Sequence, residues 1–350
     1  MPRAKKQPHE LSLVELLQKI EDKISRETLS ADQQRHMIQM VTDILQATAL
    51  QGERPLPGRD IQEVRGQAAV KRTLEVAAAG GHNILLIGPP GAGKTLLARA
   101  LPSLLPTSSV PYPFRAPHMS CGLSAFRGEP DLPGELTLAH RGVLFLEDLP
   151  AFDPAVLTVL RQGVERHVVS LPHGVESVLF PAHFMLVATM QPCPCGYYGD
   201  PVRVCTCSTE TIATYHRRTK ETVQTCFDVE IEVPLVQEDL LSKHPEESSA
   251  LIRSRVEAAR RVQQLRYTDM PQLQVNADLG TIDEVQLYCE MDPPGELIMR
   301  AALGRLSLTP RQVVRIQRVA RTIADLTKSP MLRANHIAEA TQYRSHFSPA

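Results

Sequence analysis

The sequence lacks the features that mark several classes of protein. Its 350 residues contain no run of about 18 apolar residues, so we expect no membrane span. The formal net charge is −1, which gives no support to a strongly basic nucleic-acid binder but leaves room for a local basic channel. No apolar segment follows the charged residues 1–10, so a secretory signal is not expected. We find no internal repeat and no low-complexity tract.

Cysteine is present, but not in the pattern of a disulfide framework. There are 7 cysteines, an odd number, and four of them fall within fifteen residues. This spacing fits a reducing, cytoplasmic compartment and a metal site better than a disulfide-stabilised fold. Hydrophobic residues make up 43% of the chain, which predicts a folded globular protein rather than a disordered one.

The apolar pattern changes along the chain and predicts three parts. Residues 1–50 form a helical extension, because apolar residues recur there at three- and four-residue steps. The stretch "QGERPLPGRD" is a linker into an α/β domain, which we place at 51–236. Residues 237–350 show only helical patterns and form a helical lid domain. Short apolar strands that alternate with helices predict a parallel sheet covered on both faces. The predicted strands are "HNILLIG", "GVLFLE" and "HFMLVATM".

The stretch "GPPGAGKT", residues 88–95, has the spacing of a phosphate-binding loop, G-x-x-x-x-G-K-[ST]. It follows a predicted strand and opens a helix, as the motif requires. Backbone N–H groups of such a loop turn toward phosphate oxygens, and the helix N-terminus adds a favourable dipole. Lys94 is expected to reach the β and γ phosphates of ATP, and Thr95 to bind Mg²⁺. The alternative is a plain Gly-rich turn. The expected nucleotide-binding residues are Gly88, Pro89, Pro90, Gly91, Ala92, Gly93, Lys94, Thr95 and Leu96.

Two carboxylates, Glu147 and Asp148, end the second predicted strand. In a P-loop ATPase an acidic strand tip holds Mg²⁺ and polarises the attacking water. We expect Glu147 on the metal side and Asp148 on the water side. The alternative is a solvated acidic turn ahead of "LPAF".

Several long segments resemble the magnesium-chelatase-like AAA+ ATPases, most closely the YifB/ComM branch. The resemblance runs from about Leu56 to Tyr343. It implies a P-loop AAA+ fold and an ATP-driven ring, commonly a hexamer, with the nucleotide between subunits. In the ComM group such a ring acts on DNA as a branch-migration motor, and chelatase relatives drive metal insertion into a porphyrin. The helical extension stands where the family has an N-terminal Lon-like domain. The segments that carry the resemblance include "GQAAVKRTLEVAAAGGHNILLIGPPGAGKT", "PFRAPH", "LPGELTLAHRGVLFLEDLPAF" and "FPAHFMLVATMQPCPCGYYGDP".

The resemblance assigns roles to further residues. Gln67 matches a glutamine that precedes the phosphate loop in the family. Arg311, in "LTPRQ", resembles the second-sensor arginine that reaches from the lid to the γ phosphate. Gln191 stands where the family usually has an Asn that orients water, so it keeps the amide but adds one methylene.

Departures from the family pattern bear on the rate of hydrolysis. The family order of the acidic pair is Asp then Glu, so Glu147 and Asp148 displace each carboxylate by about one C–C bond, which can cost about a hundredfold in rate. The family's finger arginine falls on Cys226, and loss of such an arginine costs about 10³ to 10⁵ where one is used. Arg217 and Arg218 are substitutes that spacing alone does not decide. We therefore expect ATP binding to survive and turnover to be slow.

The segment "CPCGYYGDPVRVCTC" contains two C-x-C pairs, Cys193 with Cys195 and Cys205 with Cys207. Residues two apart in an extended chain point to one side, and "GDP" is a turn signal, so a hairpin can bring four thiolates together around Zn²⁺. The usual spacing of zinc ligands is C-x₂-C, and the alternative is four reduced thiols in a loop.

Other polar residues have a structural interpretation beside a functional one. His118 and His140 are expected to be hydrogen-bonded structural residues rather than ligands. The arginines of "RSRVEAARRVQQLR" form either a basic face for DNA or a solvated helix face.

The sequence thus predicts a P-loop ATPase that couples ATP binding, and slow hydrolysis, to remodelling of a macromolecular partner such as DNA. The competing hypothesis is a nucleotide-binding assembly or regulatory module with little or no hydrolysis. A chelatase subunit ranks third, because the closest motifs belong to the other branch. The expected catalytic residues are Lys94, Glu147, Asp148, Gln191 and Arg311. The expected metal ligands are Thr95 and Glu147 for Mg²⁺, and Cys193, Cys195, Cys205 and Cys207 for Zn²⁺.

Overall fold

The structure is a computed structural model of the chain. All of the described residues belong to one compact unit, Pro55–Ala350. The helical extension predicted for residues 1–50 lies outside the described residues. The described residues are 59–108, 112–129, 132–173, 176–235, 246–270, 272–306 and 308–344.

The predicted parallel sheet is confirmed. Five strands pair in the order β2-β5-β8-β1-β9, and every pairing in this sheet is parallel. The three central strands are buried along their whole length, which explains their uninterrupted apolar sequences. The strands are β1 (Ile84–Ile87), β2 (Phe114–Arg115), β5 (Val143–Leu146), β8 (Met185–Met190) and β9 (Val229–Glu232).

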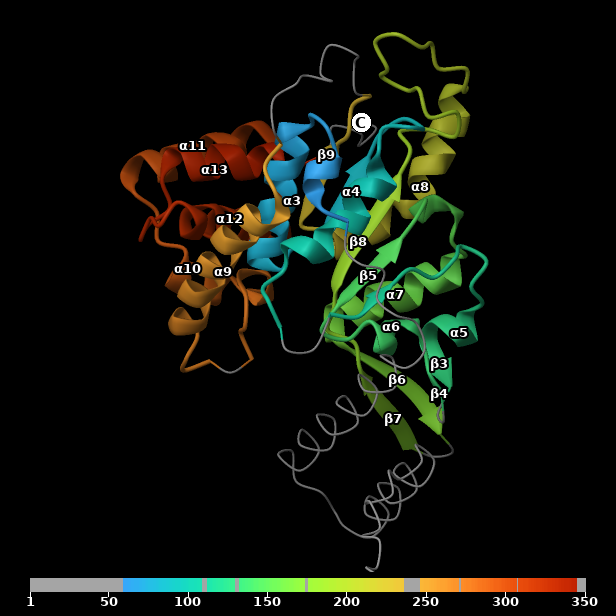
Figure 1. Cartoon of the computed structure of the whole chain (residues 1–350), viewed down its shortest axis with the longest axis horizontal. Helices are drawn as coiled ribbons and strands as arrows, with labels where there is room; N and C mark the ends of the chain where they lie inside the picture. The colour runs from blue at the N-terminus through green and yellow to red at the C-terminus, as the bar shows by residue number, and fades with distance from the viewer. Residues whose placement is uncertain are drawn as a thin grey trace, which may run out of the picture. The chain divides into compact units, whose positions relative to one another are not determined.

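Helices cover both faces of this sheet. Side chains alternate along β1, so Ile84 and Leu86 join one buried cluster while Leu85 and Ile87 join the other. The first cluster contains residues of α3 (Ala68–Gly80), α4 (Lys94–Ala100), η2 (Leu101–Leu104) and the C-terminal helices. The second cluster is formed with α5 (Leu123–Arg127), α6 (Glu135–Leu138), α7 (Pro154–Arg166) and α8 (Thr209–Cys226), and Figure 1 shows these helices on the side of the sheet away from the C-terminal ones.

Two antiparallel hairpins extend from this α/β body. The first pairs β3 (Gly128–Glu129) with β4 (Leu132–Pro133), and the second pairs β6 (Val168–His173) with β7 (Glu176–Pro181). Figure 1 shows β6 and β7 at the opposite end of the body from the loop that precedes α8.

The C-terminal part is helical, as its sequence indicates. Its helices share a buried core with α3, η2 and one face of the sheet. The boundary predicted near residue 236 falls in an interval that is not described. No helix among the described residues is long and apolar enough to cross a membrane. The helices are α9 (Ser249–Arg266), α10 (Ile282–Tyr288), α11 (Pro293–Leu306), α12 (Pro310–Leu326) and α13 (Ala334–Gln342), with the short helix η5 (Asn276–Asp278) between α9 and α10.

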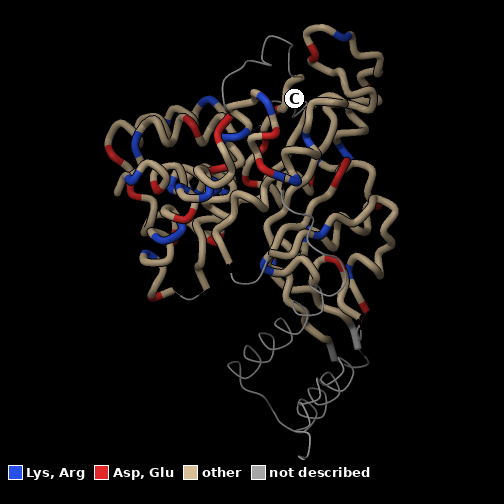
Figure 2. Tube along the Cα trace, in the orientation of Figure 1, with Lys and Arg blue, Asp and Glu red and all other residues tan. Residues whose placement is uncertain are grey.

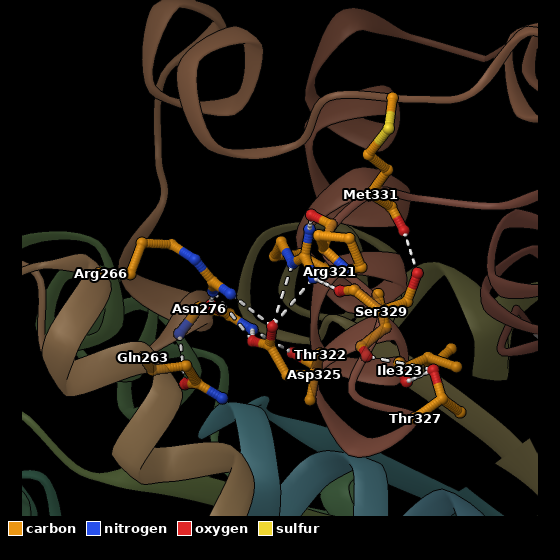
Figure 3. Close-up of polar contacts among 12 residues, drawn as sticks. Gln263, Arg266, Asn276, Arg321, Thr322, Ile323, Asp325, Thr327, Ser329 and Met331 are labelled. Atoms are coloured by element: carbon orange, nitrogen blue, oxygen red, sulfur yellow. Dashed lines mark hydrogen bonds and ion pairs between the residues drawn. The ribbon is translucent and has the colours of Figure 1, made fainter.

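A buried carboxylate ties these C-terminal helices together. Asp325 of α12 is 2.5 Å from Arg266 of α9 and 3.0 Å from Arg321, one turn earlier in α12. Asn276 of η5 donates to the same carboxylate at 2.9 Å. Figure 3 shows these side chains converging from three segments. Because the carboxylate, the two arginine side chains and the amide all have partners, the network fixes the packing of α9 and η5 on α12.

Candidate nucleotide site

The phosphate loop leaves the carboxyl end of β1 and opens α4. Gly91 and Gly93 have φ angles of +79° and +84°, which side chains of L-residues rarely adopt. Lys94, the first residue of α4, donates from Nζ to the carbonyl oxygens of Gly88 at 2.7 Å and Pro89 at 2.8 Å. Burial lowers the pKa of Lys94, and the carboxylates of Asp148 and Glu147 oppose this. The ammonium is therefore held over the concave side of the loop.

The acidic pair follows β5 and faces this loop. Thr95 donates from Oγ1 to Glu147 Oε1 in a direct contact. Asp148 has a left-handed backbone, with φ +57°, and its N–H donates to Thr189 Oγ1 at 3.1 Å. Its Oδ1 is buried without a hydrogen-bond partner, and burial raises the pKa of this carboxyl while Lys94 lowers it. A buried oxygen with free lone pairs is a ready acceptor for a bound water or ligand.

These groups line one cavity of about 430 Å³. Gly88 and Pro89 contribute the carbonyl groups that hold Lys94. Thr189 and Met190, which the motif analysis missed, also line the cavity. They are the last two residues of β8 and immediately precede Gln191, so their position at the carboxyl end of a central strand was the available signal. The lining residues are Pro90, Gly91, Ala92, Gly93, Lys94, Thr95, Leu96, Glu147, Asp148, Thr189, Met190 and Gln191.

Gln67 supports the loop from outside. Its side-chain amide donates to the carbonyl oxygens of Ala92 at 2.8 Å and Pro234 at 3.2 Å. It therefore links the phosphate loop to the segment after β9. Its own backbone is left-handed, with φ +54°, at the start of α3.

Comparison with known proteins identifies the family. The family described as "Magnesium chelatase, subunit ChlI" matches residues 60–112 and 107–241, and its C-terminal counterpart matches residues 246–344. The chain belongs to the magnesium-chelatase-like AAA+ family. Within it, the chain falls in the YifB/ComM branch.

Relatives of this AAA+ protein are longer than the chain. The chain is 37% identical to the uncharacterised protein YifB of Escherichia coli over 87% of its own length and 67% of that protein. It is 35% identical to the competence protein ComM of Haemophilus influenzae, over 91% of the chain and 69% of that protein. An uncharacterised Mycobacterium tuberculosis protein is 31% identical over 83% of the chain and 62% of its own length. The chain thus spans about two-thirds of each of these relatives.

The structure corrects the expected position of Arg311. This residue does not line the cavity of the AAA+ phosphate loop. It lies 2.9 Å from Glu165, at the end of α7, and lines a separate cavity with residues that precede β1 and β8, including Asn83 and His183. That cavity is at the amino edge of the parallel sheet, whereas the phosphate loop is at the carboxyl edge. A four-residue strand spans about 13 Å, so Arg311 does not reach the phosphates of its own chain.

The structure also shows the surroundings of Cys226, Arg217 and Arg218, the positions considered for a finger arginine. Cys226, on which the sequence analysis places the family's finger arginine, is buried, and burial raises the pKa of its thiol to about 12. Arg217 and Arg218 are exposed on α8. The structure thus leaves both available to a neighbouring molecule and places neither in the phosphate-loop cavity.

Four of the five arginines of α9 are bonded within the chain, and the fifth, Arg261, is exposed. Arg253 donates to the carbonyl oxygen of Ser103, and Arg260 donates to that of Ala78. Arg255 pairs with Glu75 and Glu247, and Arg266 pairs with Asp325. Both interpretations offered by the sequence are therefore incomplete, because these side chains fasten α9 to the rest of the chain. Figure 2 shows the two signs of charge interspersed along the C-terminal helices.

The two histidines singled out by the sequence differ in their surroundings. His140 Nδ1 accepts a hydrogen bond from the backbone N–H of His183 at 3.0 Å, and burial lowers its pKa to about 4. It is therefore a neutral structural residue, as expected. His118 is exposed and contacts Ser120.

The cysteine segment gathers its four thiols without a hairpin. Residues 191–208 form turns and bends, with no strand. The Sγ atoms of Cys193, Cys195 and Cys205 are 3.3 to 3.6 Å apart, and Cys207 Sγ joins them within 4.8 Å. All four cysteines are free. Tetrahedral Zn²⁺ with Zn–S bonds of about 2.3 Å separates its sulfurs by about 3.8 Å, so the set fits this ion.

This cysteine loop touches the phosphate loop. Gly196 has φ +86°, and a Cβ added there would lie 2.5 Å from Pro90 Cδ and 2.7 Å from Gln191 Oε1. Backbone N–H groups of Tyr197 and Thr206 point to Cys195 Sγ and lower the pKa of that thiol to about 5. The order of the cysteine loop is therefore coupled to the nucleotide cavity through direct packing.

Proposed function

We propose that this chain binds ATP with Mg²⁺ in the phosphate-loop cavity and hydrolyses it slowly, to drive remodelling of a macromolecular partner. The observation that carries the proposal is the convergence of Lys94, Thr95, Glu147 and Gln191 on one cavity, at the carboxyl ends of three neighbouring parallel strands. We assign residues 51–236 to the AAA+ nucleotide-binding domain and 237–350 to the helical lid. Cysteines that are all free fit a reducing, cytoplasmic location.

Each residue has a role that its position supports. The phosphate-loop N–H groups and Lys94 bind the β and γ phosphates. Thr95 and Glu147 hold Mg²⁺, which supplies charge neutralisation on the phosphate oxygens when bound. Asp148 has an unpartnered oxygen and a raised pKa, which suits it to accept a hydrogen bond from the attacking water. The Gln191 amide positions the same water.

Departures of the same residues from the family pattern support slow turnover. Glu147 is longer than the family's Asp, so the metal-side carboxylate is displaced by about one C–C bond. Asp148 is shorter than the family's Glu, and Cys226 replaces the finger arginine with a buried thiol. These observations also favour the second candidate function, a nucleotide-binding assembly or regulatory module with little or no hydrolysis.

We propose a homo-oligomeric ring, as a hexamer, as the working assembly. Arg311 sits at the sheet edge opposite its own phosphate loop, and its side chain is 54% exposed. In a ring it is available to the nucleotide of a neighbouring subunit. DNA remains the proposed class of partner on the basis of the branch alone, because four of the five α9 arginines are bonded within the chain.

Replacement of Lys94 tests nucleotide binding. Lys94→Ala removes a charge-assisted bond to phosphate, so we expect affinity for a non-hydrolysable ATP analogue with Mg²⁺ to fall about tenfold or more. Calorimetric titration of the purified chain measures this. Arg99→Ala is the matched control, because it removes an exposed cation from the same helix. Equal affinity of wild type and Lys94→Ala would place the nucleotide elsewhere.

The cysteine cluster is proposed as a structural Zn²⁺ site. Protein purified without chelators is expected to contain close to one zinc per chain at the cysteines, and Cys205→Ser is expected to lose it. Because Gly196 packs on Pro90, the variant without the cysteine-bound zinc should also bind the ATP analogue more weakly. Elemental analysis measures the zinc, with Cys121→Ser as the control. Equal zinc in Cys205→Ser and in the control would rule out the site.

A further inference from the structure

We infer that His167, His183 and Asp278 bind a divalent cation of the zinc class, at a site separate from the nucleotide and cysteine sites. One ligand atom from each residue lies within 4.8 Å of the other two. His183 Nε2 is 3.2 Å from Asp278 Oδ1, and the rings of His167 and His183 are 4.4 Å apart between centroids. Zn–N and Zn–O bonds of about 2.0 to 2.1 Å at a tetrahedral angle separate nitrogen and oxygen by about 3.3 Å. The His183–Asp278 spacing therefore already matches one edge of such a site.

The backbone fixes both histidines. The His167 carbonyl oxygen accepts from Ala182 N at 2.8 Å, which ties the end of α7 to the residue before His183. The His183 N–H donates to His140 Nδ1, and its carbonyl oxygen accepts from Arg141 N at 2.7 Å. Ligands held in this way need little reorganisation when an ion binds.

Asp278 is held with one oxygen presented to the histidines. Its Oδ2 accepts from the backbone N–H groups of Gln274 at 2.8 Å and Val275 at 3.0 Å. Its side chain is 8% exposed, and Oδ1 is the atom that faces His183. Arg318 donates to the carbonyl oxygens of Ala277 and Leu279, which fixes the backbone on both sides of Asp278.

An ordinary ion pair explains only part of this arrangement. A His183–Asp278 hydrogen bond accounts for two of the three residues, but not for a second imidazole beside them. His167 is exposed and has φ +56°, a conformation in which Gly or Asn is more common at the end of a helix. Two imidazoles and a carboxylate are ligands that suit zinc-class ions. Arg318, which lines the same cavity as these three residues, is paired with Asp228 rather than with Asp278.

The site joins two parts of the protein. His167 ends α7 and His183 precedes β8, both in the α/β body, whereas Asp278 belongs to η5 among the C-terminal helices. An ion bound there clamps these helices to the amino edge of the sheet, opposite the phosphate loop. The three residues line the cavity of about 520 Å³ that also contains Arg311, which leaves room for a water as the remaining ligand.

Zinc binding to the whole chain tests this inference. Protein stripped of metal is dialysed against Zn²⁺, and bound zinc is measured for wild type, His167→Gly and His183→Ala. Glycine suits the left-handed backbone at His167, so His167→Gly is expected to fold and to lose one zinc equivalent, or to bind it at least about tenfold more weakly. His118→Ala, an exposed histidine away from the three ligands, should bind as wild type does.

Cobalt distinguishes this site from the cysteines. Co²⁺ bound at the cysteine cluster gives a thiolate-to-metal charge-transfer band, and this band should persist in His167→Gly. Co²⁺ bound at the histidine site gives no such band, and it should still bind to Cys205→Ser. The inference is overturned if His167→Gly and His183→Ala bind as much zinc as wild type and as tightly. It is also overturned if Cys205→Ser removes every bound ion.

Discussion

Exchange of the two carboxylates, by Glu147→Asp together with Asp148→Glu, is expected to raise kcat for ATP about tenfold to hundredfold. The shorter residue at 147 restores the length of the family's metal-side carboxylate beside Thr95. The longer residue at 148 extends the water-side carboxylate further into the cavity. The backbone at 148 stays anchored through its N–H bond to Thr189, so the change acts on the reach of the side chain.

Steady-state ATP turnover at saturating Mg²⁺ measures the effect. Glu147→Gln serves as the opposite control, because it removes the metal-side charge and should lower kcat. Affinity for the ATP analogue should change little in the exchanged variant, since the phosphate loop is untouched. If the exchanged variant turns over no faster than wild type, the carboxylate lengths do not limit the rate.

Asp228→Asn is expected to lower the free energy of unfolding by about 3 to 5 kcal/mol, because it leaves two largely buried arginines without a countercharge. Asp228 precedes β9, and its side chain is 3% exposed. Arg318 contacts it directly, and Arg315 lies 3.8 Å away. Both arginines come from α12, so this one carboxylate holds the C-terminal helices to the sheet edge. Urea unfolding at neutral pH measures the loss, with Asp269→Asn, an exposed carboxylate, as the control.

The ionisation of Asp228 also makes the stability of the protein depend on pH. Burial raises the pKa of Asp228, but Arg318, His82 and Arg315 outweigh it and hold that pKa well below the ordinary 3.8. Its contribution to stability is therefore complete above about pH 4 and is lost as the pH falls toward the folded-state pKa. The difference in stability between wild type and Asp228→Asn should shrink at pH 3. A difference that stays constant from neutral pH to pH 3 would contradict this assignment.

The sequence was sufficient for features with local causes. Uninterrupted apolar runs predicted β1, β5 and β8, because strands that are buried on both faces carry apolar side chains on both. The phosphate loop was predicted because its glycines and its lysine have fixed positions between strand and helix. The gathering of the cysteines was predicted as well, although the hairpin was wrong, since bends at Gly196 and Gly199 replace the strand pairing.

Features that depend on packing between distant segments were beyond the sequence. Arg311 was predicted to reach from the lid to the γ phosphate, but the docking of α12 on α3 and α9 places it at the other edge of the sheet from the phosphate loop of its own chain. His167 and His183 come together only because α7 ends beside the start of β8, and Asp278 reaches them from η5. No local pattern encodes these contacts, whereas the tertiary packing produces all of them.

A single measurement tests the central claim, that this site holds ATP and turns it over slowly. The chain is mixed with labelled ATP and Mg²⁺, passed rapidly through a sizing column at intervals, and the bound nucleotide is identified. We expect the label to stay bound to wild type for many minutes, mostly as unhydrolysed ATP. We expect Lys94→Ala to retain no label. Rapid, complete conversion to ADP at the rate of an active AAA+ motor, or the absence of retained label on wild type, would contradict the account.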